Sequence, residues 1–547
     1  MMLSGSATLR KLAAISGREW GLLAAVFFAA VLRLYHLPDQ LFIDDEWHAI
    51  HAALTLSYSK ILTSFGANHI SAPIALWYRL LIDSVGLNEC LVRWPYCLFG
   101  VAIVALVPLL LRRFIGREAS TVLAWLLAVS PLLVFFSRFA RPYIIVALVG
   151  WIAVWAFYHW WREARFFYGA LYVATATMSV WLLPVAAPFV YGPLLLSLVA
   201  RVRPRSVWPQ LSFSRWLGVS FWTLVAFGLT IGPALFRDLG SLTGKSDNQT
   251  VALHEILSAF DMLLGHSSSL MTFLVVLLIL RGSLCLWKRE KTLMYYLLAL
   301  SALQVIGVIL AQPAYGFFPL VVARYLLLLL PLLLTMLAVG VTGIFDNWHA
   351  VPSTVRRSVI PSLLCLGLFL DGPLPGVYGA PSAWFSQVLG LAFHRANGES
   401  PLPPPPLASY EFLGRLPRQS VAIMEVSNSF FTLWGSELPA YDHIANQRVL
   451  IGMLNGVCGG PRPYEIPYTE ERVRFSRYAS VGDGERLKAL KVNYLVFHRK
   501  LPFDVSTSMF AMPPLDINAC VEELTHLFGR PVVEDPDVLL FEVRGKT

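Results

Sequence analysis

Leu91-Val-Arg-Trp-Pro-Tyr-Cys-Leu-Phe-Gly-Val-Ala-Ile-Val-Ala-Leu-Val-Pro-Leu-Leu-Leu111, followed at once by Arg112 and Arg113, is the stretch that decides the fold. It is about as long as a bilayer crossing, which needs roughly 20 predominantly apolar residues. Similar apolar runs recur along the first two thirds of the chain. We therefore predict an α-helical protein that crosses the membrane many times.

The composition favours the same fold class. Of the 547 residues, 56% are hydrophobic and only 14% are charged, and the mean hydropathy is +0.61. Soluble globular domains carry roughly a quarter charged residues. The formal net charge of +9 does not indicate a nucleic-acid partner, because Lys and Arg stand in short clusters beside the apolar runs. The expected partner of this surface is the lipid bilayer.

The basic clusters predict the orientation of the spans, since Lys and Arg concentrate on the cytoplasmic side. Basic residues at 10–18 precede the first apolar run, Trp20 to Leu34, which indicates a retained signal anchor with a cytoplasmic N-terminus. Threading the other runs between the clusters gives about 11 spans. The seventh is expected at Trp216 to Leu235 and the eleventh at Ile360 to Leu370, which leaves the C-terminus outside.

Three parts are predicted along the chain. Residues 1–371 form the transmembrane domain, with an outer loop at 38–90, and residues 372–406 form a proline-rich linker. Residues 407–547 form a soluble α/β domain, because helical and strand-like patterns alternate there. The helical patterns are Tyr410–Leu416, Gly484–Leu490 and Val521–Phe528, and the strand-like runs are Val421–Val426, Val492–His498 and Val538–Val543.

Two of the six cysteines, Cys458 and Cys520, lie in this C-terminal domain. They can pair if the domain faces an oxidising compartment. Two unpaired, buried thiols are the alternative.

Three consecutive carboxylates follow the first predicted span. The segment reads Leu41-Phe-Ile-Asp-Asp-Glu-Trp-His-Ala-Ile-His-Ala-Ala-Leu54. Adjacent carboxylates at a membrane surface repel each other and are costly to place there, so they indicate a function. Asp44, Asp45 and Glu46 are the candidate catalytic residues. The alternative is that Asp44 or Asp45 merely caps an interfacial helix.

The same segment offers a metal site as a competing interpretation. Asp44, Glu46, His48 and His51 supply oxygen and imidazole ligands within two helical turns. No further ligands at a set spacing are visible, so a divalent metal is an alternative and no other cofactor is predicted.

Arginines stand at the outer ends of later predicted spans. The segment Ser130 to Tyr143 carries Arg138 and Arg141, which are neighbours on a helical turn and form a paired fork suited to a phosphate. Arg324 and Tyr325 open the tenth span on the same side. Snorkelling of arginines at span ends is the alternative. Acids beside arginines at lipid depth indicate a lipid-phosphate substrate handled at the outer surface.

In this order, the segments resemble the C-type (GT-C) polytopic membrane glycosyltransferases, specifically the bacterial branch related to protein O-mannosyltransferases and lipid A aminoarabinose transferases. The resemblance covers about residues 20–345. The matching elements are Asp45-Glu46, Ala72-Pro73, Gly86-Leu-Asn-Glu89-Cys-Leu-Val-Arg93, Arg112-Arg-Phe-Ile-Gly116, Ser130-Pro131 with Ser137 to Tyr143, and Arg324 to Pro331. One departure is Trp47-His48, which replaces the small residue and aromatic usual after the acidic pair.

The resemblance implies an enzyme of the bacterial inner membrane with a periplasmic C-terminal domain. It would transfer a hexosyl or pentosyl group, with inversion, from a polyprenyl-phosphate donor to a protein, lipid or glycan acceptor on the outer face. Asp45 would be the general base, with Asp44 as its substitute, and Glu46 and His48 would position it. The residues implied to hold the lipid phosphate are Arg138, Arg141, Arg324, Tyr143 and Tyr325.

Two other classes use the same arginines. A transporter or flippase would hold a lipid-linked saccharide by its phosphate without breaking a bond. A non-catalytic accessory protein would use the acids only as helix caps. A transporter should also show charges near mid-membrane and pseudo-repeats, and neither is clear in this sequence.

Overall fold

The computed structural model divides into two compact units, residues 1–37 with 45–375, and residues 38–44 with 376–547. We describe each unit by itself. The residues that the structure describes are 20–35, 37, 46, 49–50, 52–53, 56–65, 71–85, 89–202, 212–244, 246, 250–265, 269–314, 316, 319–343, 360–371, 374, 408–417, 420–426, 447–454, 456–459, 478–499 and 515–543.

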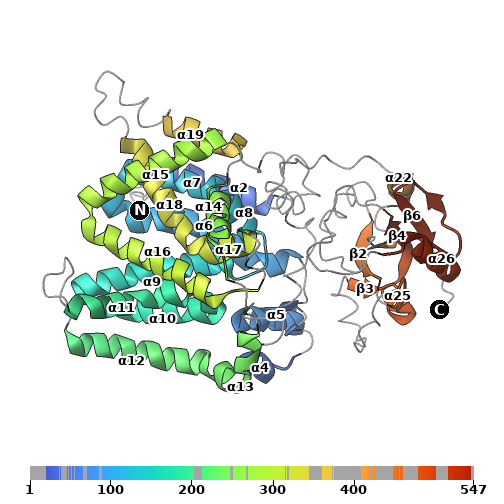
Figure 1. Ribbon diagram of the computed structural model, residues 1–547, viewed down its shortest axis with the longest axis horizontal. Coiled ribbons are helices and arrows are strands. Elements are labelled where there is room, and N and C mark those ends of the chain that lie inside the picture. Colours follow the sequence, from blue (N-terminus) through green and yellow to red (C-terminus); the bar gives the residue numbers. More distant parts are fainter. Residues whose placement is uncertain are drawn as a thin grey trace, which may run out of the picture. The chain divides into compact units, whose positions relative to one another are not determined.

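The first unit is helical, and its helices α9, α10, α11 and α16 lie side by side (Figure 1). In chain order the elements are α2 (Trp20–Leu34), α4 (Tyr58–Thr63), α5 (Ala72–Ser84), α6 (Glu89–Ile115), α7 (Arg117–Val129), α8 (Pro131–Ser137), α9 (Tyr143–Glu163), α10 (Phe166–Leu182), η2 (Pro184–Ala186), α11 (Ala187–Val202), α12 (Phe213–Thr230), α13 (Gly232–Thr243), α14 (Leu253–Leu264), α15 (Ser269–Arg289), α16 (Lys291–Ala311), α17 (Pro319–Leu326), η3 (Leu327–Leu329), α18 (Leu330–Gly343) and α19 (Ile360–Asp371).

Many of these helices are suited to a bilayer. Among the described residues, 6 helical stretches are long and apolar enough to cross a membrane, and 2 bent helix pairs would bring the number to 8. The apolar helices α2, α10 and α19 are shorter, with 15, 17 and 12 residues. Each predicted span thus corresponds to an apolar helix or helix pair. The predicted fold class, a polytopic helical membrane protein with a C-terminal α/β domain, is confirmed.

The predicted end of the seventh span is wrong. Instead of running straight to Leu235, α12 ends at Thr230 and the chain turns by 65° into α13. Pro233 stands in the first turn of α13, and a proline there cannot donate the backbone hydrogen bond that a continuous helix needs. The same reason applies at Pro131, where α7 and α8 meet at 59°.

Helices α15 and α18 cross with their backbones in contact. A Cβ atom added to Gly282 would lie 1.7 Å from the carbonyl oxygen of Met336, and one added to Gly340 would lie 2.0 Å from that of Leu278. Small residues at helix crossings are how membrane proteins obtain close packing, because burial of apolar surface does not drive association within lipid. These two glycines therefore fix the distance between α15 and α18.

We expect Gly340→Ala to lower the melting temperature of the detergent-solubilised protein. A methyl group there forces the two backbones apart, and such overpacking costs about 1–3 kcal/mol. Gly218→Ala in α12 is the matched control, since no atom lies within 4 Å of its Cβ position. Equal melting temperatures for the two variants would contradict the proposed contact.

The second unit contains a six-stranded sheet in the order β3-β2-β1-β4-β6-β5. The first four strands in this order are parallel to one another, β6 pairs antiparallel with β4, and the edge strand β5 pairs antiparallel with β6. Helices α25 and α26 pack on one face through Leu487 and Leu524, and α22 packs on the other through Leu413. The strands are β1 (Ala422–Val426), β2 (Arg448–Met453), β3 (Tyr478–Ser480), β4 (Val492–His498), β5 (Val533–Glu534) and β6 (Val538–Glu542), and the helices are α22 (Ala408–Gly414), α25 (Gly484–Ala489) and α26 (Ile517–Phe528).

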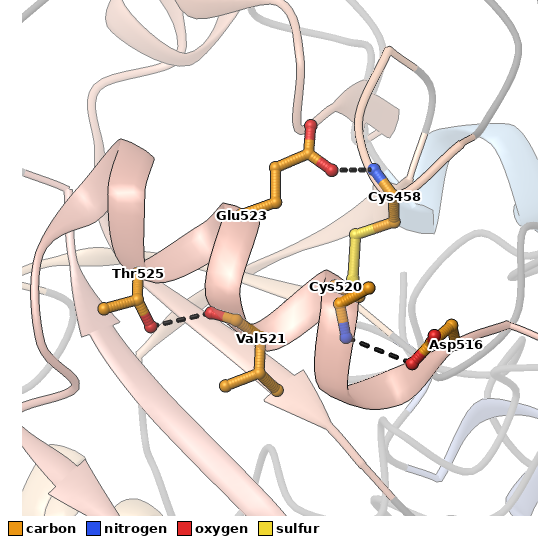
Figure 2. The surroundings of a disulfide bond; sticks show 7 residues. Cys458, Asp516, Cys520, Val521, Glu523 and Thr525 are labelled. Atoms are coloured by element: carbon orange, nitrogen blue, oxygen red, sulfur yellow. Dashed lines mark hydrogen bonds between the residues drawn. A yellow bond between two sulfur atoms is a disulfide. The ribbon is translucent and has the colours of Figure 1, made fainter.

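A disulfide joins the segment after β2 to helix α26 (Figure 2). It links Cys458 and Cys520, which are 62 residues apart in sequence. The backbone N–H of Cys458 also donates a hydrogen bond of 2.7 Å to a carboxylate oxygen of Glu523 on α26. The paired alternative for these cysteines is therefore confirmed.

A polar cluster lies beneath α22 at the carboxyl ends of β1 and β4. The hydroxyl of Tyr410 donates to Glu425 Oε1 at 2.7 Å and lies 2.9 Å from His498 Nε2, and all three side chains are fully buried. Burial lowers the pKa of His498 to about 3. The imidazole is thus neutral in the folded domain across the physiological range.

We expect the C-terminal domain to lose stability as the pH falls from about 6.5 toward 3. In this window an unfolded chain takes up a proton at His498 that the folded domain does not, which costs at most roughly 1.4 kcal/mol per pH unit. Pulse proteolysis of the full chain at pH 7.5 and pH 5 measures the difference. His498→Gln keeps a hydrogen-bonding side chain without titrating, so an unchanged pH dependence in this variant would contradict the assignment.

Candidate functional site

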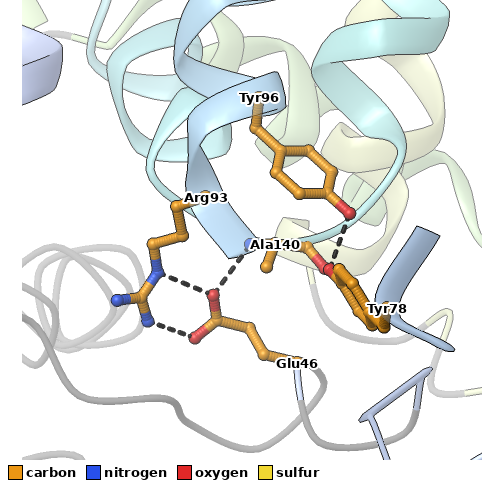
Figure 3. Close-up of polar contacts among 5 residues, drawn as sticks. All are labelled: Glu46, Tyr78, Arg93, Tyr96 and Ala140. Carbon is orange, nitrogen blue, oxygen red and sulfur yellow. Dashed lines mark hydrogen bonds and ion pairs between the residues drawn. The ribbon is translucent and has the colours of Figure 1, made fainter. Parts of the chain in front are cut away.

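Glu46 holds the acidic motif to the helical core (Figure 3). Arg93 of α6 donates from Nε to Oε1 at 2.9 Å and from Nη2 to Oε2 at 2.7 Å, and both side chains are 0% exposed. The backbone N–H of Ala140, between α8 and α9, donates to the same Oε1 at 2.8 Å. Three charge-assisted hydrogen bonds therefore join Glu46, α6 and the α8–α9 turn.

Two tyrosines hold the other side of the α8–α9 turn. The hydroxyl of Tyr78 on α5 donates to the carbonyl oxygen of Ala140 at 3.0 Å and lies 2.7 Å from the hydroxyl of Tyr96 on α6. Both backbone polar groups of Ala140 are thus bound. We call the set Glu46, Arg93, Ala140, Tyr78 and Tyr96 the clamp.

Arg141 belongs to the surroundings of the clamp. Burial raises the pKa of Tyr78 well above its ordinary value, and the Tyr96 and Glu46 side chains raise it further. Arg141 lies close enough to lower that pKa by its positive charge. The predicted phosphate-binding Arg141 and the predicted site residue Glu46 therefore face the same small region.

Arg138 has a structural contact that the sequence does not reveal. It is 1% exposed, and its Nη1 donates to the carbonyl oxygens of Leu32 and Tyr35 at the end of α2. Arg33 makes the reciprocal contact, since its guanidinium donates to the carbonyl oxygens of Leu127 and Ala128 at the end of α7. Basic side chains at helix C-termini satisfy carbonyls that lack partners in the helix.

Arg324, Tyr325 and Tyr143, three of the predicted phosphate-binding residues, lie together where α17 meets α9. The Arg324 guanidinium lies 5.0 Å from the ring centroid of Tyr325 and 5.5 Å from that of Tyr143. Its Nη2 also donates to the Tyr325 hydroxyl at 3.3 Å. These contacts orient a half-buried cation between two aromatic rings.

Four predicted site residues, Asp44, Asp45, His48 and His51, lie outside the described residues. Asp45 directly precedes Glu46 in sequence, so the clamp fixes the chain one residue after the predicted base. Within the described part of the chain, no group of three or more His, Cys, Asp or Glu side chains could hold a metal ion. The metal alternative at Asp44, Glu46, His48 and His51 stays a prediction, because only Glu46 of these four is a described residue.

Arg93 was not predicted as a site residue. In the sequence it appears only as the last residue of the Gly86 to Arg93 motif. Its signal was a positive charge inside the first turns of an apolar helix, where an unpaired cation is costly. Such a residue must have a buried partner, but the partner, 47 positions earlier, follows no local periodicity.

The fold and the site together define a multi-pass helical membrane protein with a buried carboxylate–arginine clamp beside an arginine–tyrosine cluster. None of the known family profiles matches this chain, and no curated protein matches it by sequence. The solved structures that align with it include ArnT from Cupriavidus metallidurans bound to undecaprenyl phosphate, with 12% identity and a TM-score of 0.42, and the same protein in the apo state, with 12% identity and a TM-score of 0.44. Each alignment covers 97% of this chain and 99% of the other. ArnT is a lipid A aminoarabinose transferase, one of the families that the sequence motifs resemble. At this identity the function has to be argued from the residues of the site.

We expect Arg93→Ala to destabilise the protein strongly, because it leaves the Glu46 carboxylate buried without its partner. Breaking one side of a buried ion pair costs about 3–5 kcal/mol. Thermal unfolding in detergent measures the loss, and Arg93→Lys should recover part of it because it restores the charge but not the bidentate geometry.

Arg165→Ala is the control for Arg93→Ala. Arg165 pairs with Glu163 at 3.3 Å, but its side chain is 71% exposed, and exposed pairs contribute well under about 1 kcal/mol. Similar losses for Arg93→Ala and Arg165→Ala would refute the importance of the clamp.

Proposed function

We propose that this protein is a glycosyltransferase that moves a sugar from a polyprenyl-phosphate donor to an acceptor hydroxyl on the outer face of the membrane, with inversion. The observation that carries this proposal is the clamp, in which Glu46 binds both Arg93 and the backbone of Ala140. Ala140 lies between Arg138 and Arg141, so the clamp brings the acidic motif next to arginines that can bind a phosphate. An acid–base group and an anion site are the two parts that this reaction needs.

In the proposed mechanism Asp45 is the general base. Its carboxylate takes the proton from the acceptor hydroxyl while that oxygen forms a bond to the anomeric carbon from the face opposite the phosphate. The bond between the anomeric carbon and the phosphate oxygen breaks, and the electron pair leaves with the polyprenyl phosphate. Asp44 is the substitute base. Glu46 is fully bound in the clamp, so we assign it, with His48, a positioning role.

The leaving phosphate gains negative charge, so fixed cations can stabilise it more strongly in the transition state than in the ground state. We assign this role to Arg141 and Arg324, and Tyr143 and Tyr325 orient Arg324 by the ring contacts described above. Because Arg138 donates to carbonyls at the end of α2, we propose that it holds α2 beside the phosphate site as well as adding positive charge.

We further propose that the protein lies in a bacterial inner membrane, with a cytoplasmic N-terminus and a periplasmic C-terminal domain. The Cys458–Cys520 disulfide supports this sidedness, because structural disulfides persist in oxidising compartments. The four cysteines of the helical unit, Cys90, Cys97, Cys285 and Cys365, form no disulfide. The acceptor is a protein, a lipid or a glycan, and the sugar is a hexose or a pentose.

We expect Asp45→Asn to lower sugar transfer by at least about 100-fold while retaining carrier binding, because the amide cannot accept the hydroxyl proton. The assay follows labelled sugar from a panel of polyprenyl-phosphate sugars to membrane and periplasmic acceptors. Asp44→Asn is the matched control and should retain most activity if Asp45 is the base.

A chelated sample in the same assay tests the metal alternative at Asp44, Glu46, His48 and His51. Unchanged transfer after chelation would exclude a required divalent ion. Carrier binding by the wild type without transfer from any donor would refute the enzyme and favour a flippase or an accessory protein.

A further inference from the structure

Helix α13 reaches back to the outer loop that carries the acidic motif. The side chain of Asp238 on α13 accepts a hydrogen bond of 2.9 Å from the backbone N–H of Phe65 and another from the hydroxyl of Ser64. Ser64 is the C-cap of α4, and Phe65 follows it. One carboxylate thus binds two consecutive residues of the loop across more than 170 positions of sequence.

The backbone of α13 departs from helical geometry at Asp238, the residue that makes this contact. Asp238 has φ −144° and ψ 37°, so the helix is interrupted at the residue whose side chain leaves it. The hydroxyl of Ser241 donates to the other carboxylate oxygen and holds the side chain in place. A break inside a helix removes backbone hydrogen bonds, so it is retained where the side-chain contact stabilises it.

A continuous set of contacts leads from Asp238 to the acidic motif. Ile61, in the helix that Ser64 ends, is fully buried in a cluster with Ala52 and with Ala72 and Ala75 of α5. Arg79 of α5 donates to the carbonyl oxygen of Ala53 at 3.2 Å. Ala52 and Ala53 come six and seven positions after Glu46 in the sequence, and Glu46 is bound in the clamp.

Few side chains of α12 and α13 are buried. In the preceding helix α12 only Thr223 is buried, and its glycines Gly218 and Gly228 have no atom within 4 Å of their Cβ positions. On α13, Phe236 is 94% exposed and Leu239 is 53% exposed. On α13 the buried residues Gly232 and Ala234 both precede Asp238, so the hydrogen bonds to Asp238 contribute to attaching the later part of α13 to the loop.

We infer that α13 is a clasp on the outer loop and that Asp238 is a positioning residue for the acidic motif in sugar transfer. The inference rests on the proposed function. Asp238 acts through other residues. It holds the end of α4, and α4 and α5 in turn hold Ala52 and Ala53. We propose that the position of these residues sets the position of the general base. A displacement of about 1 Å at a reacting group can lower a rate by roughly 100-fold.

The test compares Asp238→Ala, Asp238→Asn and Asp261→Asn in the full chain in nanodiscs. Asp261, on α14, is a carboxylate that accepts a long hydrogen bond of 3.4 Å from the hydroxyl of Thr272, so it is the matched control. For Asp238→Ala we expect kcat to fall by about 10-fold to 100-fold, with the KM for the donor within about two-fold of wild type, because the phosphate-binding arginines lie on other elements. Asp238→Asn should recover most of kcat, since its amide oxygen still accepts from Phe65.

Hydrogen exchange of the peptide covering residues 56–65 provides a second measurement that needs no activity. We expect faster exchange in Asp238→Ala and unchanged exchange in Asp261→Asn. Unchanged exchange in Asp238→Ala would overturn the clasp, and faster exchange with an unchanged kcat would overturn the positioning role. If the wild type transfers no sugar but exchange rises in Asp238→Ala, the proposed function fails and the clasp stands.

Discussion

The buried ion pair between Glu46 and Arg93 is the interaction on which the rest of the site depends. Taking both charges out of water costs several kcal/mol for each ion, and only good geometry offsets this cost. The structure supplies that geometry with two hydrogen bonds from the guanidinium and a third from a backbone amide. A well-packed apolar pair would be as stable, so stability alone does not explain why charges stand there. The charges add a fixed orientation, because a bidentate ion pair allows only one orientation of Glu46 relative to α6.

Arg33, Arg138 and Arg324 have two different kinds of partner. Arg33 and Arg138 bind main-chain carbonyls at the ends of α7 and α2 and thereby fasten two helices to each other. Arg324 instead lies against aromatic rings, which hold its orientation. The distinction matters for the proposed chemistry, since the ring contacts orient the Arg324 guanidinium, whereas the carbonyl contacts of Arg33 and Arg138 join helix ends.

Much of the fold follows from the sequence because its signals are local. Apolar runs such as Leu91 to Leu111 predict the spans, and the β-branched and aromatic run Val492–His498 predicts a strand. The triple acid and Arg324-Tyr325 are likewise visible as charges where charges are costly. The bend after Thr230 is readable in part from Pro233. The strands β3 and β5 have three and two residues, too few for any periodicity to identify.

Long-range pairing is the part that the sequence does not specify. No sequence pattern near Arg93 identifies Glu46 as its partner, and none near Asp238 identifies Phe65. Arg138 is typical of an exposed cation in the sequence, and its role is visible only from its contacts with the end of α2. These contacts depend on how the helices pack, which is decided by many weak contacts and by small residues such as Gly340.

The backbone contact between α15 and α18 has one more consequence. At Gly282 and Gly340 the neighbouring atoms belong to the backbone, so no side-chain rotamer can change to accommodate a movement. We therefore expect α15 and α18 to move together as one rigid unit. Helix α18 continues from α17 through η3, and α17 carries Arg324. The Arg324 guanidinium is therefore connected to a closely packed helix pair, and the proposed transfer would need little reorganisation there.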